Sequence, residues 1–128
     1  MMRTVFSMCV ACVAVFGTGC GASDTATAER GERGSPLYRQ VFAAEQSGDI
    51  KEAIRLFNKV LIVEPHSFSA HFQLATLLHD YEEDYVGAIY HYKQYLYLRP
   101  ESEKSTLAQE RIRIAEQLLA PQIGRAHV

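Results

Sequence analysis

The chain contains no tryptophan, and its 128 residues include only four prolines and eight glycines. Most of these helix breakers lie outside the middle of the chain, which is therefore able to form long helices. There is no excess of positive charge either. The formal net charge is −2, so no basic surface is predicted that could neutralise the phosphates of a nucleic acid. The sequence also lacks G-x-S-x-G, H-E-x-x-H, P-loop and dinucleotide-binding motifs, which argues against an enzyme.

The N-terminal apolar run is too short for a membrane span. Val5 to Phe16 is almost wholly apolar, but a spanning helix needs about 20 residues. After a positively charged start, a run of this length is typical of a secretory signal. The small residues before Cys20 resemble the lipobox of bacterial lipoproteins, although Gly17 stands where that family usually has Leu. We therefore predict a lipoprotein-type signal peptide over residues 1–19 and lipidation of Cys20, with plain secretion or an uncleaved apolar segment as alternatives.

The cysteines leave no disulfide in the predicted mature chain. Cys9 and Cys12 form a C-x-x-C, but they lie inside the apolar run, and we interpret them as small apolar residues of a removed segment. Cys20 is then the single remaining cysteine, which fits acylation. By resemblance to lipoproteins, Ala22 favours the outer membrane, facing the periplasm, over the inner membrane. Residues 20–34 are small and polar, and we expect a flexible tether there.

An internal repeat occupies the middle of the chain. It pairs small, aromatic and helix-ending residues at a constant offset of 35: Ala53 with Ala88, Phe57 with Tyr92, and Pro65 with Pro100. The tetratricopeptide period is about 34 residues. The extra residue falls in the turn 81–84, where an insertion is tolerated.

The segment 46–65 resembles the second half of a tetratricopeptide repeat almost position by position. Each match has a physical role, namely a glycine that ends one helix, an acidic N-cap with a capping-box partner, a small residue at a close helix approach, a buried aromatic, and a helix-ending proline: Gly48, Asp49, Glu52, Ala53, Phe57 and Pro65. A second repeat has Ala75, Ala88, Tyr92 and Pro100 at the corresponding packing positions. The first helix of repeat one is the poorer match, since Gln40 and Val41 replace a Leu and a small residue.

The resemblance implies an all-α fold, a short right-handed α-solenoid. It consists of two tetratricopeptide helix-turn-helix hairpins and a C-terminal capping helix, with the bounds 35–67, 68–102 and 103–119. Leu107, Ile114 and Leu118 recur at spacings of seven and four and are joined by Ala108, Ile112, Ala115 and Leu119, which predicts an amphipathic capping helix. Pro121 is predicted to end it.

Residues 120–128 are predicted to form a disordered tail. The segment 123–128 looks like one reading frame of a common sequencing adapter. We interpret this segment as an assembly artefact. The natural protein is then expected to continue with other residues beyond about residue 121. A genuine short tail is the alternative.

No metal, cofactor or catalytic site is predicted. His79 and the acids of the turn 80–84 could bind a hard cation weakly, but a solvated acidic loop is the simpler interpretation. His71 and His79 lie two turns apart, and no mature cysteine assists them in binding zinc.

The resemblance places the first helix of each hairpin on a concave face. Mapped onto this sequence, that face presents aromatic and polar residues of both repeats: Tyr38, Phe42, Glu45, Phe72, Thr76 and His79. Aromatics at helical spacing suit an apolar peptide or a partner helix. Some relatives clamp a C-terminal carboxylate with Lys and Asn, but Tyr38 and Phe42 replace them, so that specificity is not carried over. The alternative is that the groove is too short and these aromatics only pack.

These patterns lead to two hypotheses of function. The first is a non-enzymatic, lipid-anchored scaffold of the bacterial cell envelope that binds a protein or peptide partner, without a nucleic acid or small-molecule substrate. The second is a structural spacer or oligomerisation module for a missing C-terminal region, possibly one that binds cell wall. An enzyme with an unrecognised site is the least favoured.

Overall fold

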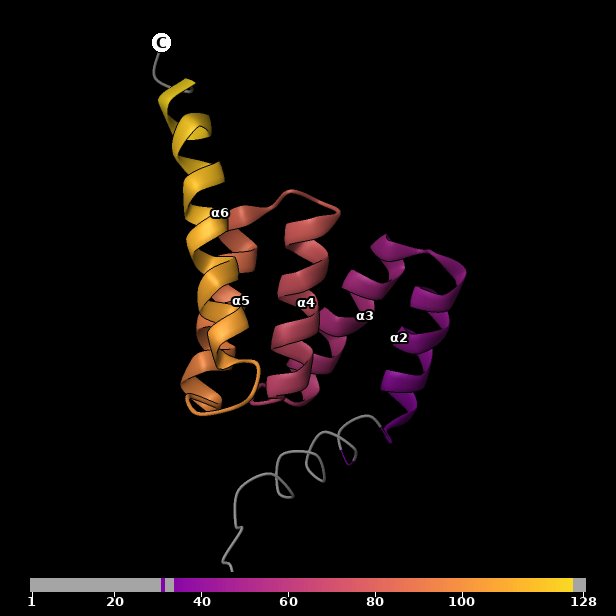
Figure 1. Ribbon diagram of the computed structural model, residues 1–128. Coiled ribbons are helices and arrows are strands. Elements are labelled where there is room, and N and C mark those ends of the chain that lie inside the picture. The colour runs from indigo at the N-terminus through magenta and orange to yellow at the C-terminus, as the bar shows by residue number, and fades with distance from the viewer. Residues whose placement is uncertain (1–30, 32–33, 126–128) are drawn as a thin grey trace, which may run out of the picture.

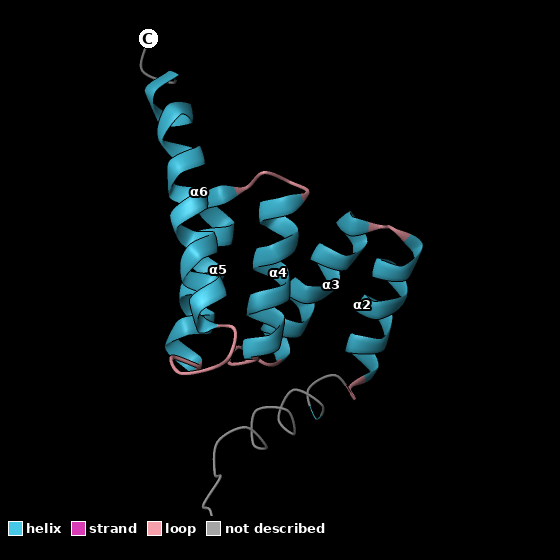
Figure 2. Ribbon diagram, viewed as in Figure 1, coloured by secondary structure: helices cyan, strands magenta, loops and turns pink. Residues whose placement is uncertain are grey.

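The computed structural model describes Gly31 and residues 34–125, and the regular structure in this part of the chain is helical, without strands. Five helices follow one another: α2 (Pro36–Ser47), α3 (Ile50–Val63), α4 (Phe68–Asp80), α5 (Tyr85–Leu98) and α6 (Ser105–Arg125). Each packs against the next along the chain, so α2–α3 and α4–α5 form two hairpins closed by α6 (Figures 1 and 2). The predicted all-α, helical-repeat fold is confirmed. The predicted signal peptide, Cys20 and most of the predicted tether lie outside the described residues.

The first hairpin begins and turns at residues suited to helix ends. Ser35 caps α2, because its hydroxyl accepts a hydrogen bond from the Tyr38 amide at 3.3 Å. Gly48 ends α2 in the left-handed conformation, with φ 75°, which glycine adopts without strain. Asp49 caps α3 by accepting from the Glu52 amide at 3.1 Å. The Glu52 carboxylate pairs with Arg55 instead of completing the predicted capping box.

The second hairpin uses the same kind of caps with a different turn. Ser67 caps α4, and Asp84 caps α5 by accepting from the Gly87 amide at 3.0 Å. A Cβ on Gly87 would lie 2.5 Å from an Asp84 carboxylate oxygen, so a larger residue there would require the Asp84 side chain to shift. Glu83 occupies the left-handed region, with φ 53°. This residue therefore carries backbone strain that Gly48 avoids in the first turn.

Two apolar clusters form the core. The first lies between α2, α3 and α4 and the second between α4, α5 and α6. The small and aromatic residues that repeat at an offset of 35 are fully buried, as is the small residue of the second repeat's first helix: Ala53, Phe57, Ala88, Tyr92 and Ala75. Small side chains at these places let neighbouring helices approach closely, while the aromatics fill the space between them.

The closing helix differs from its predicted bounds. It starts at Ser105 and continues through Pro121 to Arg125, so the prediction that Pro121 ends it and that a tail begins at residue 120 is wrong for 120–125. Residues 120–124 are exposed, and α6 projects beyond the hairpins (Figure 1), so the carbonyl that loses its partner to proline is accessible to water. Residues 126–128 lie outside the described part of the chain.

The face of α6 that packs on the core is part of the predicted apolar face. Ala108 and Ala115 are fully buried and Ile112 packs against the second cluster, whereas Leu107 and Leu118 remain 48% and 42% exposed. The small alanines permit a close approach to α5 that leucines would prevent. Within the described residues, no helix combines the length and the apolar character needed to cross a membrane.

Candidate functional site

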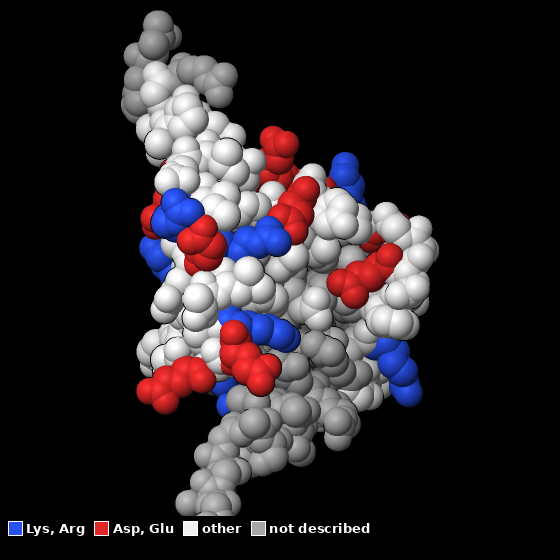
Figure 3. All heavy atoms as spheres, viewed as in Figure 1, with Lys and Arg blue, Asp and Glu red and all other residues white. Residues whose placement is uncertain are grey.

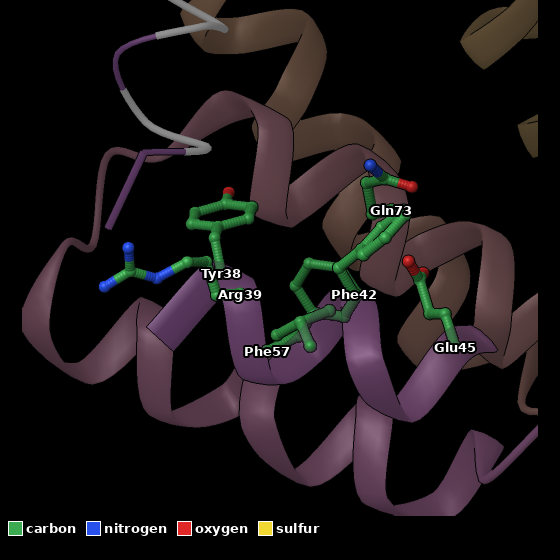
Figure 4. A pocket seen from close by; sticks show the side chains of 7 residues that line it. Tyr38, Arg39, Phe42, Glu45, Phe57 and Gln73 are labelled. Atoms are coloured by element: carbon green, nitrogen blue, oxygen red, sulfur yellow. The ribbon is translucent and has the colours of Figure 1, made fainter. Parts of the chain in front are cut away.

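A pocket of about 570 Å³ lies where the two hairpins meet. Its lining comes mostly from α2, with one residue each from α3 and α4: Tyr38, Arg39, Val41, Phe42, Glu45, Phe57 and Gln73 (Figure 4). Three of its α2 residues, Tyr38, Phe42 and Glu45, follow an i, i+4, i+7 spacing, which places them on one face of the helix. The pocket therefore opens on the surface formed by the first helices of both hairpins.

The floor of the pocket is fixed by aromatic packing. Phe57 is fully buried, and its ring meets the Tyr38 ring edge-on, with the ring centroids 6.1 Å apart. The Tyr38 side chain is only 5% exposed, and its hydroxyl lies 2.9 Å from the hydroxyl of Ser67. Tyr38 was predicted to be an exposed partner contact, but its side chain is buried and forms part of the pocket floor. Its polar end can be buried because Ser67 supplies a hydrogen-bond partner.

The rim of the pocket is accessible. Phe42 lies one turn after Tyr38 and remains 62% exposed. Gln73 faces it from α4, and Glu45, partly buried, lies at one end of the row (Figure 4). Arg39, which sequence reasoning did not select, lies at the other end. The result is an apolar floor and an aromatic rim between a cation and an anion.

The three residues predicted from the second repeat do not line this pocket. The Phe72 ring packs edge-on against Tyr92 and Tyr95, with ring centroids 5.7 and 5.0 Å apart. The Thr76 hydroxyl donates to the Phe72 carbonyl and lies 3.2 Å from the Tyr92 hydroxyl. The amino group of Lys104 lies 5.4 Å from the centre of the Phe72 ring. Contacts with α5 and with the segment before α6 thus cover part of the aromatic surface that was predicted to bind a partner, and Phe72 and Thr76 stay partly exposed.

His79 is also part of the packing. Its imidazole is buried, and its ring centroid lies 5.5 Å from that of Tyr85 and 6.4 Å from that of Tyr92. Burial lowers the pKa of His79, and the Asp80 carboxylate opposes this only in part. Its Nδ1 is buried without a hydrogen-bond partner in the described structure. The ring therefore packs as an aromatic surface and is only 8% exposed.

A histidine pair joins α4 to α5 on a different side of the molecule. The Nδ1 atoms of His71 and His91 lie 2.9 Å apart, and His71 Nε2 lies 3.1 Å from the Pro65 carbonyl oxygen. A carbonyl only accepts, so His71 donates from Nε2, and its Nδ1 accepts from His91. Burial, followed by the charge of His71, lowers the pKa of His91 to about 4. Sequence reasoning missed the pair, although His71 aligns with Leu37 of the first repeat, a position expected to be buried.

Charged groups elsewhere do not form a second site of clear chemistry. Among residues 34–125, no three His, Cys, Asp or Glu side chains gather to hold a metal ion. Acidic and basic side chains alternate over the face in Figure 3, so that face carries no field of one sign. The acids 82–84 are exposed, as expected for a solvated turn.

Comparison of the chain with protein-family models, with curated proteins and with solved structures finds no match in any of the three. The functional argument therefore depends on the fold and on the geometry of the pocket between the hairpins.

Proposed function

We propose that this chain is a tetratricopeptide-type scaffold that binds a segment of another protein in the pocket between its hairpins, and that it is not an enzyme. The observation that carries this proposal is the exposed Phe42 ring above a rigid apolar floor. Phe42 is mostly accessible to water in the unbound chain. Covering the exposed part of this ring would contribute about 1–2 kcal/mol to binding.

The shape of the pocket supports a peptide-sized ligand. A volume of about 570 Å³ lies within the range of pockets that hold small ligands or a few side chains. The pocket also lies on the first helices of the two hairpins, where the resemblance to tetratricopeptide repeats places a peptide-binding face. The floor residues are held by packing, so little entropy is lost when a segment binds.

The proposal can be tested with peptides selected for binding to the purified chain. The affinity of the selected peptides is then measured for the wild type, for Phe42→Ala and for Ile62→Ala. Ile62 is a matched control, because it is 78% exposed on α3 and lies outside this pocket. Phe42→Ala is expected to weaken binding by about fivefold to thirtyfold, while Ile62→Ala leaves it unchanged. Equal affinities for all three proteins would place binding elsewhere.

The location of the scaffold is proposed from the sequence pattern. The apolar run followed by small residues and Cys20 supports a lipid-anchored protein of the cell envelope, at the outer membrane and facing the periplasm. Metabolic labelling with a clickable fatty acid tests this, since Cys20→Ser is expected to abolish the label. A label that survives this substitution would exclude Cys20 as the acylated residue.

A spacer or oligomerisation module is the second candidate, and one observation favours it. The projecting end of α6 exposes Leu118 and Ile123 to 42% and 52%. An apolar helix end of this kind suits contact with further protein. If this candidate holds, light scattering will show self-association that Leu118→Ser with Ile123→Ser removes, and a strict monomer argues against oligomerisation.

A further inference from the structure

We infer that the bound segment presents an acidic side chain next to the apolar side chain that it inserts, and that Arg39 recognises this carboxylate. The inference rests on the proposed function, because it concerns the ligand of the same pocket. It adds a chemical class of partner, namely a peptide segment with an Asp or Glu beside a large apolar residue.

Arg39 is the one arginine with a described side chain that has no partner. The other four make ion pairs or lie over a ring: Arg55 with Glu52, Arg111 with Asp80, Arg113 with Glu110, and Arg99 over Phe68 at 4.2 Å. Arg39 makes no ion pair, side-chain hydrogen bond or ring contact within the described residues. An unpaired guanidinium at the edge of an apolar pocket is available for a ligand.

The chemistry of the guanidinium selects a carboxylate. Its planar fork of N–H donors matches the two oxygens of a carboxylate, which a point charge such as ammonium does not. The apolar side chains of Phe42 and Tyr38 beside it exclude water when a ligand binds. This strengthens the ion pair between Arg39 and the carboxylate. A basic side chain at the same place would meet a like charge.

The spacing of Arg39 and Phe42 fits a single short segment. The two residues are three apart on α2, which puts their Cβ atoms about 5–6 Å from each other. Side chains on the same face of an extended peptide are about 7 Å apart, and those one helical turn apart are about 5–6 Å apart. One acid and one apolar residue of the same segment can therefore reach both groups.

The inference is tested with amidated nine-residue peptides that carry a central Phe or Leu. The residue two positions from it, on the same face of an extended segment, is Asp or Glu in one set, Asn or Gln in the second, and Lys in the third. Affinities for the full chain are measured by fluorescence anisotropy. The acidic set is expected to bind about threefold to tenfold more tightly than the amide set. This range extends from the contribution of an exposed ion pair to that of a bidentate pair between a guanidinium and a carboxylate.

Variants of Arg39 assign this preference. Arg39→Gln is expected to abolish the difference between acidic and amide peptides, and Arg39→Glu to favour the Lys set. Lys59→Gln is the matched control, because it removes the same charge from an exposed site on α3 outside the pocket and should leave the difference intact. An acidic preference that persists in Arg39→Gln overturns the inference.

Two further outcomes separate this inference from the proposed function. If Phe42→Ala weakens all peptides but the Arg39 variants leave the acidic preference unchanged, the pocket binds peptides and only the role of Arg39 is wrong. If Phe42→Ala affects no peptide, the proposed function itself fails. Peptides that bind only with a free C-terminal carboxylate, and not when amidated, would also overturn the assignment to an acidic side chain.

Discussion

Lowering the pH from 7.5 to 5 is expected to destabilise the helical domain through the histidine pair. His91 has a folded-state pKa of about 4, below the ordinary value of 6.5, because burial and the neighbouring His71 both disfavour its charged form. Between these two values the unfolded chain binds a proton that the folded chain does not. The stabilising contribution is therefore complete above pH 6.5 and is lost as the pH falls toward 4.

The size of this effect follows from the two pKa values. At pH 5, the difference between 6.5 and about 4 corresponds to about 2 kcal/mol of lost stability. His91 is only partly buried, and water screens its charge, so about 1 kcal/mol is the better expectation. For a domain of this size, 1 kcal/mol lowers Tm by about 4–8 °C. Circular dichroism melts at several pH values between 7.5 and 5 measure it directly.

A single substitution isolates the histidine pair. His91→Gln cannot titrate, yet its amide N–H₂ can still donate to His71, so this variant is expected to lose a large part of the pH dependence. Part of it will remain, because the pKa values of His71 and His79 are also lowered. The reasoning fails if His91→Gln retains the same dependence of Tm on pH as the wild type.

Three other substitutions test the turns and the pocket floor. Glu83→Gly removes the strain of a left-handed glutamate, so it is expected to raise the free energy of unfolding, measured in urea, by about 0.5–1 kcal/mol. Gly48→Ala introduces such strain and should lower the free energy of unfolding by about 1 kcal/mol. Changes of the same sign in the two variants would contradict this account. Tyr38→Phe removes the hydrogen bond to Ser67 and is expected to cost about 1 kcal/mol in the same assay while leaving peptide affinity within about twofold. A large loss of affinity in Tyr38→Phe would instead make its hydroxyl a ligand contact.

The hairpins could be predicted because their information is local. A cap, a small residue, a buried aromatic and a helix-ending residue recur at fixed spacing in α3 and α5, and each restricts the backbone within its own turn. Ala53 and Ala88 lie at equivalent places for this reason. The architecture of the described chain therefore follows from a pattern that a single repeat already contains.

The surfaces could not be predicted as well, because they depend on distant residues. The Tyr38 hydroxyl is buried beside the hydroxyl of Ser67, which belongs to the next hairpin, and the Phe72 ring is partly covered by aromatics of α5 and by Lys104. Which residues of the predicted apolar face of α6 are buried depends on close approach to α5, which favours alanine over leucine. His71 and His91 are twenty residues apart and match no motif. In each case the deciding contact comes from another helix.

The serine at the start of α4 belongs to both hairpins. Its hydroxyl caps α4 through the Ala70 amide and also meets the Tyr38 hydroxyl of α2. The serine that caps the first turn of α4 is therefore held in place by a hydrogen bond with Tyr38 of the first hairpin. In a one-dimensional array, such a shared bond is a coupling energy between nearest neighbours. The two hairpins should accordingly unfold in a single cooperative transition, and protection of their amides from hydrogen exchange should be lost together rather than one hairpin at a time.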